Sequence, residues 1–212
     1  MCNQISKTLL ILSLILNGCS YGTPINKSRI INVLRVPNSR VIAILVKRTT
    51  LKSPEGLAKF PDGGKPKILG IESSIYLFDI DKKELHTLLV FQNLPNQLIG
   101  FEPWLKGWHG QDLYFKTTGC PSTREVDIHG CGESKITTKY FKVNGQGVSQ
   151  PVEMIPTVLN QGRNSPLVAT PDEFNYTRIS SDYNSIDVTT TDSNNFHRIL
   201  ELDDQGNLKQ IE

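Results

Sequence analysis

The feature that most constrains the fold of this chain is a repeated order of short apolar segments and turn-forming residues. Apolar segments of five to nine residues alternate with Gly, Pro, Asn and Asp after about residue 30, a pattern typical of β-strands joined by turns. One such segment begins near Val41, one near Asp112 and one near Ser185, at intervals of 71 to 73 residues. A repeat of this kind predicts three similar supersecondary units.

Each unit is predicted to contain four strands. In the first unit the expected strands are 30–36, 41–47, 74–80 and 84–91. In the second they are 96–101, 111–117, 135–143 and 147–153, with a turn over 103–110. In the third they are 173–180, 184–190, 195–202 and 207–211. The long connections are expected to meet at one end of the sheets, and they are 48–73, 118–134 and 154–172.

The predicted fold class is therefore all-β, with three four-stranded antiparallel meanders. The run from Val41 to Val46 is apolar at every position. A strand without alternation is expected to have apolar neighbours on both of its faces. The first unit should accordingly contain a strand that is buried from two sides.

The stretch from Pro103-Trp104 through Leu113-Tyr114-Phe115-Lys116 resembles the core of a TolB-type β-propeller repeat. Val36–Ala43 resembles the turn and following strand of that repeat, and Ile75–Asp81 with Leu85–Leu88 resembles its outer half. The resemblance implies propeller-like blades and a core position for Trp104. Because a propeller ring usually has four to eight blades, three blades predict an open or incomplete ring. A β-sandwich or barrel is the alternative.

The first 18 residues resemble a bacterial lipoprotein signal peptide. Lys7 precedes an apolar core that ends at Leu16, and Asn17-Gly18 lead to Cys19. This core is shorter than the about 20 apolar residues that span a bilayer. The resemblance implies cleavage before Cys19 and a diacylglycerol group on its thiol. An ordinary secretory leader with a coincidental cysteine is the alternative.

These features predict a tether over 19–29 and a β-meander domain over 30–212. The expected location is the bacterial cell envelope, with the lipid anchor as the contact to a membrane. Ser20 follows the cysteine, and in a Gram-negative cell a non-acidic residue at this place implies the periplasmic face of the outer membrane.

Two further cysteines, Cys120 and Cys131, lie in one Gly-rich segment. In an oxidising envelope this pair predicts a disulfide that closes a small loop. A metal site with Cys120, His129 and Cys131 is the alternative, but the spacing is not that of a four-ligand zinc site. We therefore predict no metal site and no cofactor.

Charge and motifs exclude several classes of function. The formal charge is +2, or +1 without the leader, and the basic residues are scattered along the sequence, so nucleic-acid binding is not expected. Motifs of Ser hydrolases, zinc proteases and nucleotide-binding proteins are absent from the sequence. We accordingly assign no catalytic residue and expect the protein not to be an enzyme.

The predicted function is that of a lipid-anchored scaffold or protein-interaction module, whose partner is another envelope protein bound at the long-loop end. The alternative is a glycan- or peptidoglycan-binding lipoprotein that uses exposed aromatic side chains, with Trp108 and His109 as the candidate ligand-binding residues. A hydrolase with a site formed by the long loops is a third reading. Two chains that complete one ring would make the protein a homo-oligomer.

Overall fold

A computed structural model describes residues 22–53, 66–93, 103–119, 137–160, 176–189 and 196–211. These residues form twelve β-strands and no helix. The strands are β1 (Ile25–Arg35), β2 (Val41–Lys52), β3 (Lys67–Asp79), β4 (Glu84–Asn93), β5 (Trp104–His109), β6 (Asp112–Gly119), β7 (Thr137–Val143), β8 (Ser149–Val152), β9 (Tyr176–Ile179), β10 (Ser185–Thr189), β11 (Phe196–Leu202) and β12 (Leu208–Gln210).

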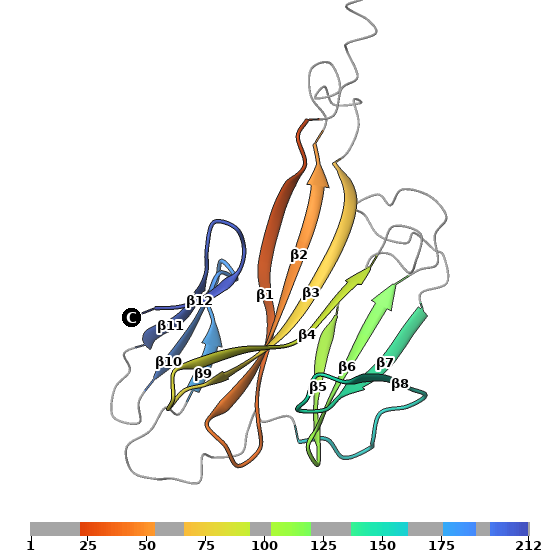
Figure 1. The fold of residues 1–212 in the computed structure, drawn as a ribbon, viewed down its shortest axis with the longest axis vertical. Helices are drawn as coiled ribbons and strands as arrows, with labels where there is room; N and C mark the ends of the chain where they lie inside the picture. Colours follow the sequence, from red (N-terminus) through yellow and green to blue (C-terminus); the bar gives the residue numbers. More distant parts are fainter. Residues whose placement is uncertain are drawn as a thin grey trace, which may run out of the picture.

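The strands form three four-stranded antiparallel sheets, which confirms the predicted fold class. We call them the central sheet (β1–β4), the second sheet (β5–β8) and the third sheet (β9–β12). The described strands do not close into a barrel (Figure 1). Each sheet is a meander, because strands that follow one another in the chain are hydrogen-bonded neighbours. Strands β2, β6 and β10 begin at Val41, Asp112 and Ser185, the three positions from which the repeat was predicted.

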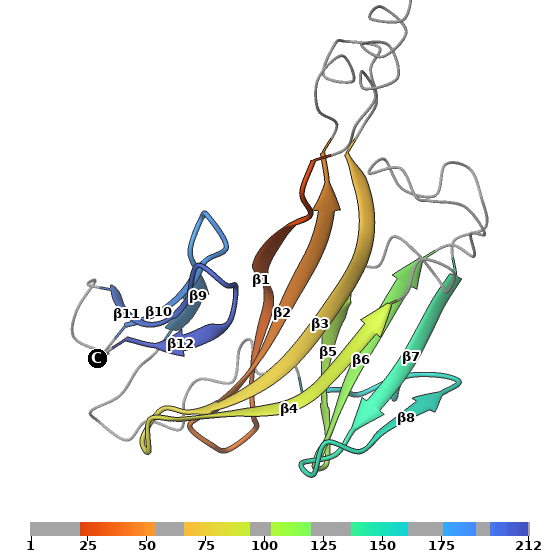
Figure 2. The same cartoon turned by 45° about the horizontal axis from the view of Figure 1, so that its top comes forward.

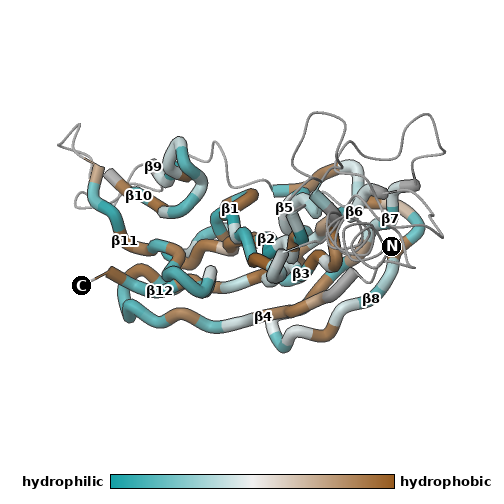
Figure 3. The backbone as a smooth tube through the Cα atoms, turned by 90° about the horizontal axis from the view of Figure 1, so that it is seen from above, coloured by the Kyte–Doolittle hydropathy of each residue, from teal (hydrophilic) through white to brown (hydrophobic). Residues whose placement is uncertain are grey.

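The central sheet lies between the other two sheets (Figure 3). On one face, Ala43, Leu45 and Ile75 pack against a cluster that contains Leu113 and Phe115 of the second sheet. On the other face, a second core cluster combines residues of the central and third sheets, namely Ile30, Ile42, Ile44, Val46, Phe78, Ile186, Leu200 and Leu208. The apolar run of β2 thus places alternate residues in two different cores, as expected for a strand buried on both faces.

One prediction about the strands was wrong, and another is not tested by the described residues. The segment predicted as a turn over 103–110 contains strand β5, and the tight turn after it comprises Gly110 and Gln111. The segment of the predicted strand 96–101 lies outside the described residues. Strand β5 forms because its backbone pairs with β6, from Trp104 opposite Lys116 to His109 opposite Asp112.

The central sheet is longer than predicted at the end where β1 begins. Strand β1 begins at Ile25, so the expected tether 19–29 is already strand from that residue. Strand β2 continues to Lys52 and β3 begins at Lys67, within the predicted connection 48–73. The register pairs Arg48 with Glu72 and Lys52 with Lys67. Pairing between the strands satisfies the backbone N–H and C=O groups of these extensions. The extensions therefore form strands although many of their side chains are polar.

Turns of the third sheet attach it to the central sheet. The backbone N–H of Ile30 in β1 donates to the carbonyl oxygen of Tyr183, with a distance of 2.8 Å. Nη2 of Arg48 in β2 donates to Oδ1 of Asn207 in the β11–β12 turn, with a distance of 2.7 Å. These contacts connect parts of the chain that lie far apart in the sequence.

A returning segment covers the edge of the second sheet. Asn160 and Trp108 exchange two backbone hydrogen bonds, with N to O distances of 2.8 and 2.9 Å. Strand β5 would otherwise present unpaired backbone groups at this place. The chain after β8 therefore closes back on the first strand of its own sheet.

Candidate binding surfaces

The residues predicted for lipidation and for a disulfide lie outside the described part of the chain. These are Cys19, Cys120 and Cys131, and most of the long connections predicted to form a partner-binding end lie outside it too. The first described residue, Gly22, donates its backbone N–H to the carbonyl oxygen of Ser53, with a distance of 2.9 Å. Gly22 therefore lies beside the end of β2.

Trp108, predicted as an exposed ligand-binding residue, is buried. Its side chain is 5% exposed and belongs to the core cluster between the central and second sheets. Trp104, for which the resemblance implied a core position, is half-buried. A sugar stacks on an aromatic ring whose face is open to solvent. The predicted exposure of Trp108 was wrong, and Trp104 is the more exposed of the two tryptophans.

A β-bulge in strand β5 explains why the two tryptophans lie on opposite faces of the second sheet. The register changes between Leu105, opposite Phe115, and Gly107, opposite Tyr114, so one extra residue is inserted. Residues four apart in a regular strand lie on the same face. The inserted residue moves Trp104 to the face opposite that of Trp108.

His109, the second candidate ligand-binding residue, is exposed and lies on the face of the second sheet that points away from the core. Its Nδ1 lies 3.4 Å from the carbonyl oxygen of Val158. Its ring meets the ring of Tyr114 edge to face, with 6.5 Å between the centroids. Trp108 and His109 therefore do not share one ligand-binding surface.

The outer face of the second sheet carries a row of larger side chains. The register places Lys116 of β6 between Trp104 of β5 and Tyr140 of β7. All three residues are half-buried. Lys142 on the same face donates to Oδ2 of Asp112, with a distance of 3.0 Å, and this hydrogen bond raises the pKa of Lys142. We call Trp104, Lys116 and Tyr140 the aromatic row, after its two outer residues.

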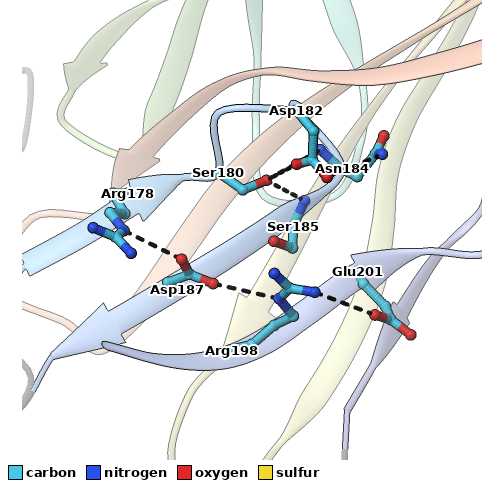
Figure 4. A network of polar contacts seen from close by, with 8 residues as sticks. All are labelled: Arg178, Ser180, Asp182, Asn184, Ser185, Asp187, Arg198 and Glu201. Atoms are coloured by element: carbon cyan, nitrogen blue, oxygen red, sulfur yellow. Dashed lines mark hydrogen bonds and ion pairs between the residues drawn. The ribbon is translucent and has the colours of Figure 1, made fainter. Parts of the chain in front are cut away.

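The outer face of the third sheet carries a row of charged residues. Asp187 of β10 lies in register with Arg178 of β9 and with Arg198 of β11. Nε of Arg178 lies 3.2 Å from Oδ2 of Asp187, and Nε of Arg198 lies 3.6 Å from Oδ1 (Figure 4). The Asp187 side chain is 10% exposed, and the two arginine side chains are 54% and 51% exposed. We call these three residues the arginine row.

Further charges and an aromatic ring extend the arginine row. Cζ of Arg178 lies 3.5 Å from the ring centroid of Phe196, which is itself 38% exposed. Nη1 of Arg198 lies 4.0 Å from Oε2 of Glu201, and Glu201 accepts from Lys209 at 3.0 Å. This hydrogen bond raises the pKa of Lys209. The surface therefore combines guanidinium groups with an accessible aromatic face.

A tight turn beside the arginine row fixes the start of β10. Oγ of Ser180 accepts from the backbone N–H of Ser185 at 2.9 Å and donates to Asp182. The hydrogen bond from Ser180 lowers the pKa of Asp182. Figure 4 shows this turn next to the Asp187 carboxylate. Hydrogen bonds within the turn thus hold β9 and β10 in the register that aligns the arginine row.

The sequence contains only a weak signal for the arginine row. Asp187 alternates with Ile186 and Val188 in its predicted strand, whereas Arg198 has the same parity as Leu200 and Leu202. The alignment of Asp187 with Arg198 also depends on a register change between Ile186 and Asp187, and such a bulge has no clear signal in a single sequence.

Other kinds of site have less support in the described residues. Across the six described segments, His, Cys, Asp and Glu side chains do not come together in groups of three that could hold a metal ion. The same segments contain no helix long and apolar enough to cross a membrane. In comparisons with known proteins, the chain matched no protein family, no curated sequence and no solved structure.

Proposed function

We propose that the protein is a non-catalytic interaction module of the bacterial envelope, anchored by lipid on Cys19. We further propose that the arginine row binds an acidic segment of another envelope protein. One observation carries the second part: a nearly buried carboxylate holds two half-exposed arginines in a single row.

The arginine row has the properties of a preorganised binding surface. A guanidinium group has five N–H donors, and Asp187 faces Nε of each arginine. The Nη donors of Arg178 can bind a partner carboxylate in a bidentate manner, and Nη2 of Arg198 can donate to the same partner segment. Because the side chains are already held by Asp187, binding costs less side-chain entropy than it would for free arginines.

The residues around the arginine row favour a protein partner. Arginine and aromatic residues are enriched at the energetic centres of protein interfaces. Phe196 contributes an exposed ring beside Arg178. The three cations Arg178, Arg198 and Lys209 are about half exposed, whereas the carboxylates of Asp187 and Glu201 are 10% and 32% exposed. An acidic partner segment is therefore the complementary occupant.

The lipid anchor is supported by the sequence Leu16-Asn17-Gly18-Cys19. Metabolic labelling with palmitate tests it, and we expect the label in the wild-type chain and its loss in Cys19→Ser. Labelling that persists in Cys19→Ser, or a wild-type chain without label, would contradict the anchor.

Site-specific photo-crosslinking in living cells tests the arginine row. A photoreactive amino acid in place of Phe196 should give one discrete adduct with an envelope protein. We expect Arg178→Ala with Arg198→Ala to abolish the adduct and the control Lys116→Ala on the second sheet to leave it unchanged. An adduct that still forms in the double arginine variant would overturn the assignment of the arginine row as the binding surface. An adduct of two copies of this chain would replace the foreign partner by a homo-oligomer.

A second candidate function is glycan or peptidoglycan binding by the aromatic row. Trp104 and Tyr140 are both half-buried and lie two strands apart, which corresponds to about 9 to 10 Å between their backbones. Two rings at this separation can contact neighbouring sugar units. Retention on purified peptidoglycan that is lost in Trp104→Ala and kept in Arg178→Ala would favour this function over the first.

A further inference from the structure

We propose that the projecting end of the central sheet is a basic surface that rests on an anionic lipid membrane. This end comprises residues 25–29 of β1, 47–52 of β2 and 67–72 of β3, and we call it the basic tip. The orientation of the tip toward a bilayer rests on the lipid anchor proposed above. Its affinity for an anionic lipid surface can be tested without the anchor.

The basic tip is built by the register of three long strands. Lys27 lies opposite Thr49, and Thr49 lies opposite Ile71. The strands have 11, 12 and 13 residues, and their ends project beyond the second and third sheets (Figures 1 and 2). The described strands of the other two sheets therefore leave the tip open to a flat surface such as a bilayer.

The basic tip concentrates positive charge in a chain that is nearly neutral. Its three segments contain six basic residues and one acidic residue, whereas the whole chain has a formal charge of +2. The basic residues are Lys27, Arg29, Lys47, Arg48, Lys52 and Lys67. The acidic residue, Glu72, lies 3.4 Å from Arg48. The connection 54–65 contains two basic and two acidic residues, so it does not cancel the excess.

Part of the positive charge of the tip is accessible, whereas the guanidinium of Arg48 faces Glu72 and Asn207. Lys27 and Arg29 are exposed, and Lys47, Arg48 and Lys52 are half-buried. The guanidinium of Arg29 lies 5.9 Å from the ring centroid of Tyr183, a contact that leaves its charge in place. Basic side chains of this kind can approach lipid phosphates while their aliphatic stems stay packed on the sheet.

The start of the described chain links the basic tip to the proposed anchor. Gly22 is hydrogen-bonded to Ser53 beside the end of β2. Three residue steps separate Gly22 from Cys19, and they reach at most about 11 Å. This distance is close to the Debye length of about 8 to 10 Å at physiological salt. A lipid on Cys19 would therefore hold the tip within the electrostatic range of the headgroups.

Charge complementarity selects anionic lipid as the occupant. Each basic residue near an anionic bilayer surface contributes about 1 kcal/mol to binding. Neutralising two lysines should thus weaken binding about thirty-fold, since about 1.4 kcal/mol corresponds to a factor of ten. The short tether and the projecting shape bring these charges to the bilayer together.

Vesicle flotation of the full chain with the Cys19→Ser substitution tests the proposal. The vesicles contain either phosphatidylcholine alone or equal parts of phosphatidylcholine and phosphatidylglycerol. We expect binding to the mixed vesicles, weakening at high salt, and a loss of about thirty-fold in Lys27→Gln with Lys52→Gln. All variants keep the same leader, so the difference between them reports the tip.

The matched control is Lys82→Gln with Lys83→Gln, in the exposed β3–β4 turn at the other end of the same sheet. It changes the net charge equally and should leave vesicle binding unchanged. Equal loss in both pairs, or equal binding to both vesicle types, would overturn the proposal. Binding to double-stranded DNA without binding to mixed vesicles would assign the tip to nucleic acid instead. Because Cys19 is absent from this assay, its outcome is independent of the labelling test for the anchor.

Discussion

Arg48 and Asn207 are 159 residues apart in the sequence, and Nη2 of Arg48 donates to Oδ1 of Asn207 with a distance of 2.7 Å. This hydrogen bond joins the central sheet to the last turn of the third sheet. Gly206 of the same turn packs on Ser28 of β1. The apolar core between these sheets is therefore supplemented by a polar contact that fixes their relative position.

We expect a double-mutant cycle of Arg48→Ala and Asn207→Ala to give a coupling energy of about 0.5 to 1.5 kcal/mol in the free energy of unfolding, the usual contribution of one hydrogen bond. Urea denaturation measures it. Thr50 and Asn26 form a control pair within the central sheet, with a distance of 2.8 Å between Oγ1 and Oδ1. A coupling near zero for Arg48 and Asn207 would show that the turn is not held by this contact.

We expect Gly206→Ala to lower the free energy of unfolding by about 1 to 3 kcal/mol. Gly206 has φ of +79°, and an added Cβ would collide with the Ser28 side chain. Gly110→Ala is the matched control, because Gly110 also has a positive φ, +59°, and a Cβ there meets nothing within 4 Å. Urea denaturation measures both free energies of unfolding. An equal loss in the two variants would contradict the close packing of Gly206 on Ser28.

Trp108→Ala is expected to cost about 3 to 5 kcal/mol of unfolding free energy, as for other buried tryptophans, whereas Trp104→Ala should cost about 1 kcal/mol. Trp108 is 5% exposed and Trp104 is half-buried. Fluorescence provides a second readout, since Trp104→Phe leaves Trp108 as the single tryptophan. Its emission should be blue-shifted and protected from iodide; a solvent-exposed spectrum would contradict the bulge in β5.

Asp203 should contribute to the loss of stability in acid. Hydrogen bonds from backbone N–H groups, that of Asn207 first, lower the pKa of Asp203 below its usual 3.8. A lowered pKa means that the stabilisation is complete above about pH 4 and is lost as the pH falls through the lowered value. We expect Asp203→Asn to reduce the dependence of the urea midpoint on pH below about pH 4. Asp204→Asn, at an exposed neighbouring position, is the control for the change in net charge. An equal change in the pH dependence of the urea midpoint in both variants would contradict the role of Asp203.

Local chemistry made much of the fold predictable. The turn at Asp79 is held by its own carboxylate, which accepts from the backbone N–H groups of Asp81 and Lys82 at 3.0 and 3.1 Å. Asn144 accepts in the same way from Gln146 and Val148. Such turns depend on neighbouring residues alone. For this reason the strand order and the starts of β2, β6 and β10 could be read before any tertiary contact was known.

The candidate surfaces were less predictable. A single inserted residue in β5 puts Trp104 and Trp108 on opposite faces. A register change between β10 and β11 aligns Asp187 with Arg198. A β-bulge is one extra residue opposite a neighbouring strand, so its place depends on how the two strands pair. Local sequence preference therefore does not decide where it forms.

The sequence by itself determined the all-β class, the three meanders and the two-sided burial of β2, because turn chemistry and apolar periodicity act over a few residues. The tertiary structure decided which charges and rings share a surface. Basic residues that are scattered along the chain gather at one end of the central sheet, and the arginine row exists because three strands align. The physical reason is that side chains on different strands become neighbours through backbone register, and register is set by long-range pairing.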